Sequence, residues 1–263
     1  MSATSMGTAL HAEWTKLRTV AGTGWLLLAA AVLTAGLSAA SLAATRCPAG
    51  NCGVDATKLS LTGVQLGQAV VAMLAVLAVS NEYSTGMIHT TLTAMPRRTT
   101  VLAAKATILT SAVLMAAPVG VLGSVLAGRL ILPGHGFTTA RGYPPLSIGD
   151  GPTLRAAAGS VLYLALIALL SVGIATLVRD SAAAIGTVLG LLYLFPIVLQ
   201  VVTDPTLKRH LQQIAPSNAG LTIQATVDLH SLPIGPWAGL GVLAAWAAGA
   251  LLAGGALLHL RDA

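Results

Sequence analysis

The sequence predicts an all-α integral membrane protein with six transmembrane helices. The chain has 263 residues, of which 55% are hydrophobic and only 8% are charged. A helix needs about 20 apolar residues to cross the hydrocarbon core of a bilayer. Six stretches without Asp, Glu, Lys, Arg or His are close to that length: residues 24–44, 61–79, 106–128, 156–177, 182–201 and 237–258.

The connections between these stretches are short, so a single domain is expected. The part of the chain outside the stretches is split into pieces that are each smaller than a soluble catalytic domain of ~100 residues or more. We therefore expect residues 1–263 to form one transmembrane domain. The first stretch could instead be a cleavable signal peptide, but its long leader, which contains Glu13, opposes this.

The distribution of charge gives a weak prediction of orientation. Lys and Arg divide evenly between the two sides, and the segments on the N-terminal side are shorter and denser in positive charge. The positive-inside rule then favours a multi-pass protein of the cell membrane with cytoplasmic N- and C-termini. Cys47 and Cys52 would lie in an outer loop, where a disulfide can persist, although two unpaired thiols are the alternative.

The segment before the first span is predicted to be an interfacial amphipathic helix. Leu10, Trp14 and Leu17 recur at helical spacing and share one face, while Glu13 and Lys16 fall outside this stripe. Such a helix would lie along the membrane surface with its apolar face towards the lipid. The alternative is a simple anchor with no mechanical role.

The connection between the second and third spans is predicted to carry a short cytoplasmic helix. Ile88, Leu92 and Met95 share one helical face, and Pro96 ends the helix because proline cannot continue the hydrogen-bond ladder. A soluble partner could push on such a helix. The alternative is an ordinary amphipathic loop in which Glu82 pairs with Arg97 or Arg98.

The same segment resembles the first cytoplasmic loop of ABC-2-type ABC transporter permeases. The resemblance rests on the pattern Glu82-Tyr83-Ser84-Thr85-Gly86, followed by Leu92, Pro96, Arg97, Arg98 and Lys105. Residues 13–19, which read Glu-Trp-Thr-Lys-Leu-Arg-Thr, resemble the N-terminal helix of the actinobacterial branch of that family. Six spans and a short C-terminal tail also fit, so the resemblance covers essentially the whole chain.

The resemblance implies that this chain is the permease subunit of an ATP-driven exporter and forms the substrate path. A separate ABC ATPase would dock on a coupling helix at 83–95 and on the turn at Arg179 and Asp180. Glu82 would be a polar hinge at the membrane edge. A second copy or a paralogous permease would complete a dimer in the lipid bilayer, and ATP and Mg would be bound by the partner ATPase.

No cofactor, metal or catalytic site is predicted for the chain itself. The P-loop requires Gly-Lys-Ser/Thr, and no lysine here follows a glycine. The histidines show no metal-ligand spacing, and no Lys/Arg run suggests nucleic acid as a partner. The chain is therefore not expected to be an enzyme. Its uncharged spans also disfavour a secondary transporter, because such proteins place ionisable groups inside the membrane.

Polar and small residues within the spans allow two interpretations each. They comprise Gln65, Gln68, Tyr163 and Tyr193, which could line a substrate path or form interhelical hydrogen bonds, and Gly186 and Gly190, a G-x-x-x-G pair. For the glycine pair, packing within one chain is favoured over a subunit interface. Residues 202–236 are expected to form two short helices, the second capped by Asn218; the resemblance implies that these are re-entrant helices, and a surface loop is the alternative.

The main alternative to a permease is a non-transporting membrane scaffold or sensor subunit that docks a cytoplasmic partner. It would share the six spans and the amphipathic loop but would need no substrate path. The sequence does not specify the substrate of a permease or whether its dimer is homomeric.

Overall fold

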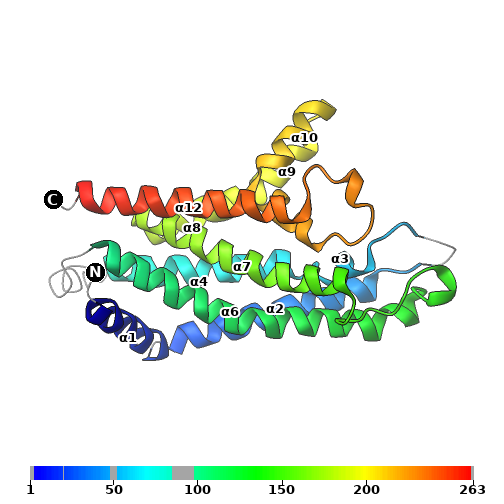
Figure 1. Ribbon diagram of the computed structural model, residues 1–263, viewed down its shortest axis with the longest axis horizontal. Coiled ribbons are helices and arrows are strands. Elements are labelled where there is room, and N and C mark those ends of the chain that lie inside the picture. The colour runs from blue at the N-terminus through cyan, green and yellow to red at the C-terminus, as the bar shows by residue number, and fades with distance from the viewer. Residues whose placement is uncertain (1–2, 20, 48–51, 85–97, 262–263) are drawn as a thin grey trace.

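The computed structural model is a bundle of long helices (Figure 1) and describes residues 3–19, 21–47, 52–84 and 98–261. Within these ranges there is no β-strand, and six helical segments are long and apolar enough to cross a membrane. This confirms the all-α membrane class. The spans are Gly22–Ala44, Val64–Tyr83, Thr99–His135, Gly151–Val178, Ser181–Val201 and Pro236–Leu258. Both termini lie at the same end of the bundle, which we call the terminal end.

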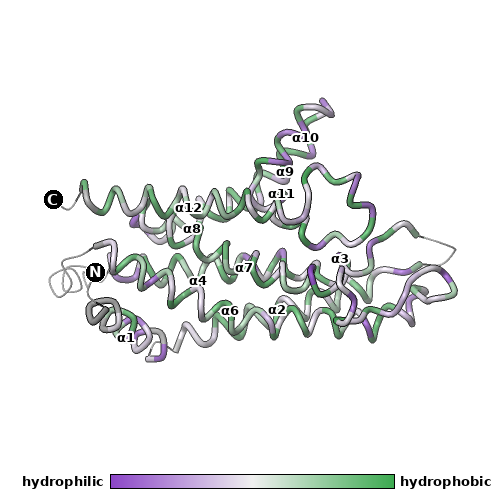
Figure 2. Tube along the Cα trace, in the orientation of Figure 1, coloured by the Kyte–Doolittle hydropathy of each residue, from purple (hydrophilic) through white to green (hydrophobic). Residues whose placement is uncertain are grey.

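The helix α7 (Gly151–Val178) is the centre of the bundle. It packs against α4 (Val64–Ser84), α6 (Arg98–Ile131) and α12 (Pro236–Arg261), while α2 (Ala21–Ala44) packs mainly on α6 and α4. Most of the α7 side chains are buried, whereas in α2 and α12 most residues are partly or fully exposed. Figure 2 shows hydrophobic residues along the helices and the most hydrophilic ones in the loops and on short outer helices.

The second and third spans are longer than the uncharged stretches of the sequence. The predicted start of the second span, Leu61, is wrong, because residues 61–63 form a turn and α4 begins at Val64. At the other end, α4 continues past Val79 and carries Glu82 into its last turn. The helix α6 likewise begins before Lys105. The predicted stretches stop at the first charged residue, whereas the helices continue and include Glu82 and Lys105.

Small residues allow α7 and α12 to approach each other closely. A Cβ atom added to Gly173 would lie 2.6 Å from the Ala250 carbonyl carbon, and one added to Gly254 would lie 3.0 Å from the Gly173 carbonyl oxygen. The predicted intrachain packing of Gly186 and Gly190 is wrong, because no described atom lies within 4 Å of either added Cβ. These two glycines face away from their own bundle.

A π-helical segment in the fifth span explains why the chain leaves the bundle there. Between α8 (Ser181–Leu189) and α9 (Phe195–Val201), residues Gly190–Leu194 form a π-helix. Pro196 has no N–H to donate to the Leu192 carbonyl four residues earlier. The Ser217 hydroxyl donates to that carbonyl instead, at 2.9 Å, as membrane-buried backbone requires.

After this bend, α9 leads into α10 (Pro205–Ile214), which projects away from the bundle (Figure 1) and buries none of its residues. The next helix, α11 (Pro216–Leu221), returns to the core. Asn218 was expected to cap that helix, but the prediction is wrong because α11 begins at Pro216 and includes Asn218. Proline suits the first helical position, where its missing N–H has no intrahelical partner.

Candidate functional site

Four charged side chains from three helices meet at the terminal end and form what we call the ionic cluster. Glu13 and Lys16 come from α1 (Ala3–Thr19), Glu82 from α4 and Lys105 from α6. The Lys16 ammonium lies 3.0 Å from Glu13 Oε1 and 2.8 Å from Glu82 Oε1. The Lys105 ammonium lies 3.1 Å from Glu13 Oε2 and 2.9 Å from the same Glu82 oxygen. Each ammonium therefore contacts both carboxylates.

The ionic cluster is buried, and its charges cancel. Glu13 is 4% exposed, and Glu82 and Lys105 are each 6% exposed, whereas the Lys16 side chain is about a third exposed. Lys105 Nζ also donates to the Ala78 carbonyl at 3.2 Å. Buried charges are tolerated when they are paired and hydrogen-bonded, and this arrangement meets that condition with two acids and two bases.

Burial of the Lys16 ammonium acts to lower its pKa, but hydrogen bonds from it to Glu82 and Glu13 outweigh burial and raise the pKa above the ordinary lysine value. A raised pKa in the folded state stabilises the fold below the unfolded-state value, and the contribution is lost as pH rises through the folded-state pKa. The contribution of Lys16 is therefore complete at neutral pH and is lost only in strongly alkaline solution.

The ionic cluster adds a second role to the polar face of α1. Glu13 and Lys16, which lie off the apolar stripe, face the bundle. Trp14 is 38% exposed and points away from the core, while Leu10 is half-buried and the Leu17 side chain lies outside the described structure. The sequence identified an amphipathic helix correctly, but its polar face has partners of its own on α4 and α6.

A cavity of about 440 Å³ lies beside the ionic cluster, between the α1–α2 corner and the facing sides of α4 and α6. We call it the corner cavity. The four charged residues form one side of it. Its other walls are aliphatic and include Leu26, Leu74, Leu77, Ile108 and Leu109.

Most of the predicted coupling helix lies outside the described residues. This holds for Gly86, Ile88, Leu92, Met95 and Arg97, and the Arg98 side chain is also outside them. What the structure places is the base of the segment, because Glu82 precedes it and Lys105 follows it. Glu82 pairs with Lys16 and Lys105; the suggested pairing with Arg97 or Arg98 falls on side chains outside the described structure and stays a prediction.

The second predicted docking element, the turn at Arg179 and Asp180, lies against the end of α4. Arg179 has a left-handed backbone conformation (φ 63°) that ends α7, and Asp180 caps α8 by accepting from the Ala183 N–H at 2.7 Å. The Arg179 guanidinium carbon lies 5.3 Å from the centre of the Tyr83 ring, a distance typical of a cation–π contact. The turn and the start of the predicted coupling helix are therefore in contact.

The polar residues predicted at membrane depth bond to one another. Tyr163 and Gln68 are buried, and the Tyr163 hydroxyl donates to the Gln68 side-chain oxygen. The Tyr193 hydroxyl donates to the Gln65 backbone carbonyl. These bonds join α4 to α7 and to the π-helical segment, as the interhelical alternative requires, and a role in a substrate path stays a prediction.

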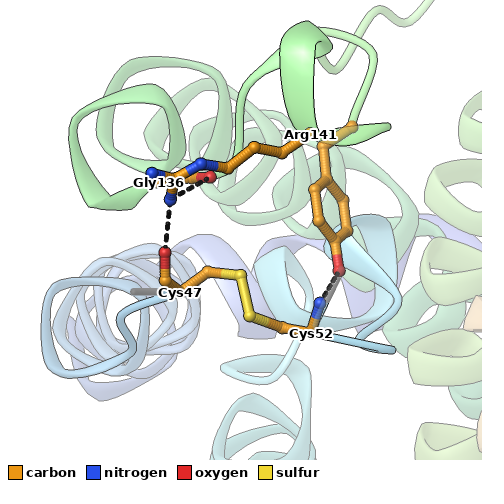
Figure 3. Close-up of a disulfide and its surroundings, with 5 residues drawn as sticks. Cys47, Cys52, Gly136 and Arg141 are labelled. Carbon is orange, nitrogen blue, oxygen red and sulfur yellow. Dashed lines mark hydrogen bonds between the residues drawn. A yellow bond between two sulfur atoms is a disulfide. The ribbon is translucent and has the colours of Figure 1, made fainter. Parts of the chain in front are cut away.

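At the opposite end of the bundle, hydrogen bonds link the connection between α2 and α4 to the connection between α6 and α7 (Figure 3). Cys47 and Cys52 form a disulfide, and Arg141 donates to the Cys47 carbonyl at 2.6 Å. The Tyr143 hydroxyl accepts from the Cys52 N–H at 3.0 Å, so both cysteines bond to the connection between α6 and α7. This pairing ties both ends of segment 47–52 to the connection between α6 and α7.

At the same end of the bundle, Asp55 makes a second set of hydrogen bonds between distant segments. It caps the short helix α3 (Ala56–Ser60) by accepting from the Lys58 N–H at 3.0 Å. It also accepts from the Thr226 hydroxyl at 2.8 Å and from the backbone N–H groups of Thr226 and Val227. One carboxylate thus ties the loop after α11 to the connection between α2 and α4.

Known proteins do not identify the chain. No family model and no curated protein sequence matches it. Among the described residues, no group of three or more His, Cys, Asp or Glu side chains could hold a metal ion.

Proposed function

We propose that this chain is the membrane permease subunit of an ATP-driven exporter of the ABC-2 type, coupled to a separate ATPase at its terminal end. The proposal takes its family from the resemblance in residues 82–98 and 13–19. Its mechanical part comes from the arrangement of charged residues around the base of the predicted coupling helix. In this orientation the terminal end is cytoplasmic.

The observation that carries the proposal is the ionic cluster. Glu82 and Lys105 stand on the two sides of segment 85–97, and each contacts α1 as well as the other. A force applied to that segment would reach α4, α6 and α1 together, because the bonds between them are short and buried. Buried ion pairs have a narrow range of good geometries, so the three helix ends would move as one body.

The contact of Arg179 with Tyr83 supports the same mechanism. It brings the α7–α8 turn to the base of the coupling segment, and the Ser181 hydroxyl reinforces it by donating to the Ser80 hydroxyl at 2.8 Å. A docked ATPase could therefore act on both elements at once. The central helix α7 begins at the opposite end of the bundle and ends at this turn, so it would carry the displacement across the membrane.

A dimer is the second part of the proposal. Most residues of α2, α9 and α12 are partly or fully exposed, and a Cβ added to Gly186 or Gly190 would meet no side chain and no other helix within 4 Å. Glycines on an exposed helix face allow close approach of another helix. A second copy or a paralogous permease would cover these faces, and the substrate path would lie between or beside the two subunits.

The direct test is crosslinking in the native membrane from a photoreactive amino acid at position 92. We expect capture of a P-loop ATPase there and none from position 211 on the projecting α10, which serves as the control. Capture of a different protein from position 92, or of none while the protein is intact, would favour the scaffold alternative.

A functional test uses the ring of Tyr83. In liposomes containing the permease and its ATPase, Tyr83→Leu should reduce ATP-driven transport, because the Arg179 contact is lost. Tyr83→Phe keeps the ring and should retain more of the transport than the leucine variant. Equal transport by the two variants would show that the ring contact has no part in coupling.

A further inference from the structure

The projecting helix α10 is amphipathic, and most of its apolar face is uncovered. Leu207, Leu211 and Ile214 recur at positions i, i+4 and i+7, so they share one face of the helix. Leu207 is 51% exposed and Ile214 is 53% exposed, and α10 buries none of its residues. The described chain therefore leaves this apolar face for something else to cover.

The rest of the α10 surface carries positive charge. An α-helix turns about 100° per residue, so Lys208 lies at the flank of the apolar face and Arg209 lies opposite it. Neither cation forms an ion pair with any residue that the structure describes. Asp204, the acid next to α10, caps the helix by accepting from the Thr206 and Leu207 N–H groups at 2.8 and 3.2 Å. With two cations and one acid, α10 and its cap have one net positive charge.

The helix α10 lies at the level where the neighbouring spans meet the membrane surface opposite the terminal end. The fifth span ends at Val201, just before α10, and the sixth begins at Pro236. Gln213 donates to the Pro233 carbonyl at 2.7 Å, which places the last turn of α10 beside the start of the sixth span. Figure 1 shows that α10 projects to the side of the bundle and not beyond its end. A helix that projects sideways at this level meets lipid headgroups and the adjoining acyl chains.

We propose that α10 lies in the lipid–water interface of the leaflet opposite the terminal end and binds anionic phospholipid there. Its apolar face rests on the acyl chains, and Lys208 and Arg209 contact the phosphates. Interfacial helices combine these two features, with an apolar face buried about 5–10 Å and basic residues on the polar face. The position of Lys208 suits this arrangement, because a lysine stem can follow apolar surface while its ammonium reaches the headgroups.

A second copy of this chain is a poorer cover for the same face. Pairing of α10 with α10 about a two-fold axis would place the same patch of both chains in contact. The cations Lys208 and Arg209 would then lie near their own copies, with no acid of α10 available to neutralise them. Phospholipid supplies both the hydrocarbon and the negative charge that α10 lacks.

The test places a fluorescent label on each face of α10 in the full chain, reconstituted in nanodiscs that hold one copy. Cys47 and Cys52 are disulfide-bonded and are the only cysteines, so an introduced cysteine is the single free thiol. A nitrobenzoxadiazole label at Leu207→Cys should be quenched by phosphatidylcholine that is spin-labelled near the headgroup, and it should be shielded from iodide in solution. The same label at Gln212→Cys, on the polar face, should show the reverse.

Two results would overturn the proposal. Quenching of both labels by iodide and of neither by lipid would mean that α10 stands in water. Shielding of the Leu207→Cys label from both quenchers would mean that protein covers the apolar face. Ile214→Cys provides a second, equally exposed site on that face, so poor folding of one variant leaves the test intact.

A comparison of two lipids tests the charge. With the label at position 207, spin-labelled phosphatidylglycerol should quench at an about fivefold lower mole fraction than spin-labelled phosphatidylcholine, the factor expected for one net charge at an anionic surface. Lys208→Gln/Arg209→Gln should abolish this preference. The control Lys58→Gln/Arg129→Gln removes two exposed cations from α3 and α6 at the same end of the bundle and should keep it.

Equal quenching by the two lipids in the protein with an unchanged polar face, or loss of the preference in the control, would refute the binding of anionic lipid to α10. The measurement uses the chain alone, without an ATPase. Its failure would therefore not bear on ATPase docking, and failure of docking would not bear on it.

Discussion

Replacing Lys105 with methionine should destabilise the bundle by about 3 kcal/mol. Removing one partner of a buried ion pair costs about 3–5 kcal/mol, because the opposite charge is left uncompensated. Lys105 is 6% exposed and serves both Glu13 and Glu82. Lys16 remains to share these carboxylates, and its partial exposure admits water, so the lower end of the range is expected.

A second substitution should reverse most of this loss. In the double variant Lys105→Met/Glu82→Gln, the remaining charges are Glu13 and Lys16, which already lie 3.0 Å apart and cancel. We expect this variant to lie within about 1 kcal/mol of the wild type, because neutral replacements of a whole buried pair are often tolerated. The two substitutions should therefore be strongly non-additive, as expected for residues in contact.

The assay is equilibrium unfolding in mixed micelles, followed by tryptophan fluorescence, to which Trp14 on α1 and Trp25 at the start of α2 contribute. Lys58→Met on the exposed surface of α3 is the control and should change stability by no more than about 0.5 kcal/mol. The reasoning is refuted if Lys105→Met behaves like this control, or if the double variant loses the sum of the two single losses.

Three further predictions concern helix packing and the end of the bundle opposite the terminal end. Gly239→Ala should lower the free energy of unfolding by about 1–3 kcal/mol, because its Cβ would lie 2.0 Å from the Ala219 carbonyl oxygen. In the control Gly241→Ala, the added Cβ meets no side chain and no other helix within 4 Å, so this variant should be neutral or stabilising. Equal thermal stabilities of the two variants would contradict the prediction. Asp55→Ala should lower the free energy of unfolding by about 2–3 kcal/mol and expose the loop after α11 to proteolysis. The control Asp150→Ala removes a residue at a cap position that makes no side-chain hydrogen bond, so it should lower stability far less. Equal cleavage of the two proteins would argue against the role of the Asp55 hydrogen bonds. A membrane-impermeant thiol reagent should label Cys47 in intact cells only after reduction, and reduction should lower stability by about 2 kcal/mol; labelling without reduction would exclude the disulfide.

The sequence predicted the spans well because hydropathy measures the quantity that selects them, the cost of placing side chains in hydrocarbon. It could not predict the ionic cluster, whose contacts join residues up to 92 positions apart. The sequence did contain one signal. Glu82 lies at the C-terminal end of one apolar span, and Lys105 lies at the beginning of the next. Glu13 and Lys16 were assigned only to the face opposite the apolar stripe, because helical periodicity shows which residues share a face and not what covers it.

The site at the opposite end was harder to predict for a similar reason. Asp55 looked like any loop carboxylate, yet it binds a segment about 170 residues later in the chain. Asn218 was assigned a cap by its residue type, whereas Pro216 two residues earlier defines the start of α11. Gly186 and Gly190 matched a packing motif correctly as a pattern, but the pattern does not say whether the partner helix belongs to the same chain.

The order of charges along the chain has a consequence for membrane insertion. Glu13 and Lys16 are made first, three residues apart on one helix, and can neutralise each other before any partner exists. Glu82 and Lys105 follow as a second opposite pair that flanks one helical hairpin. The ionic cluster is therefore the union of two halves that are each neutral once both members have been made. A chain with its two acids on one half and its two bases on the other would have the same final charge, but each half by itself would carry two like charges.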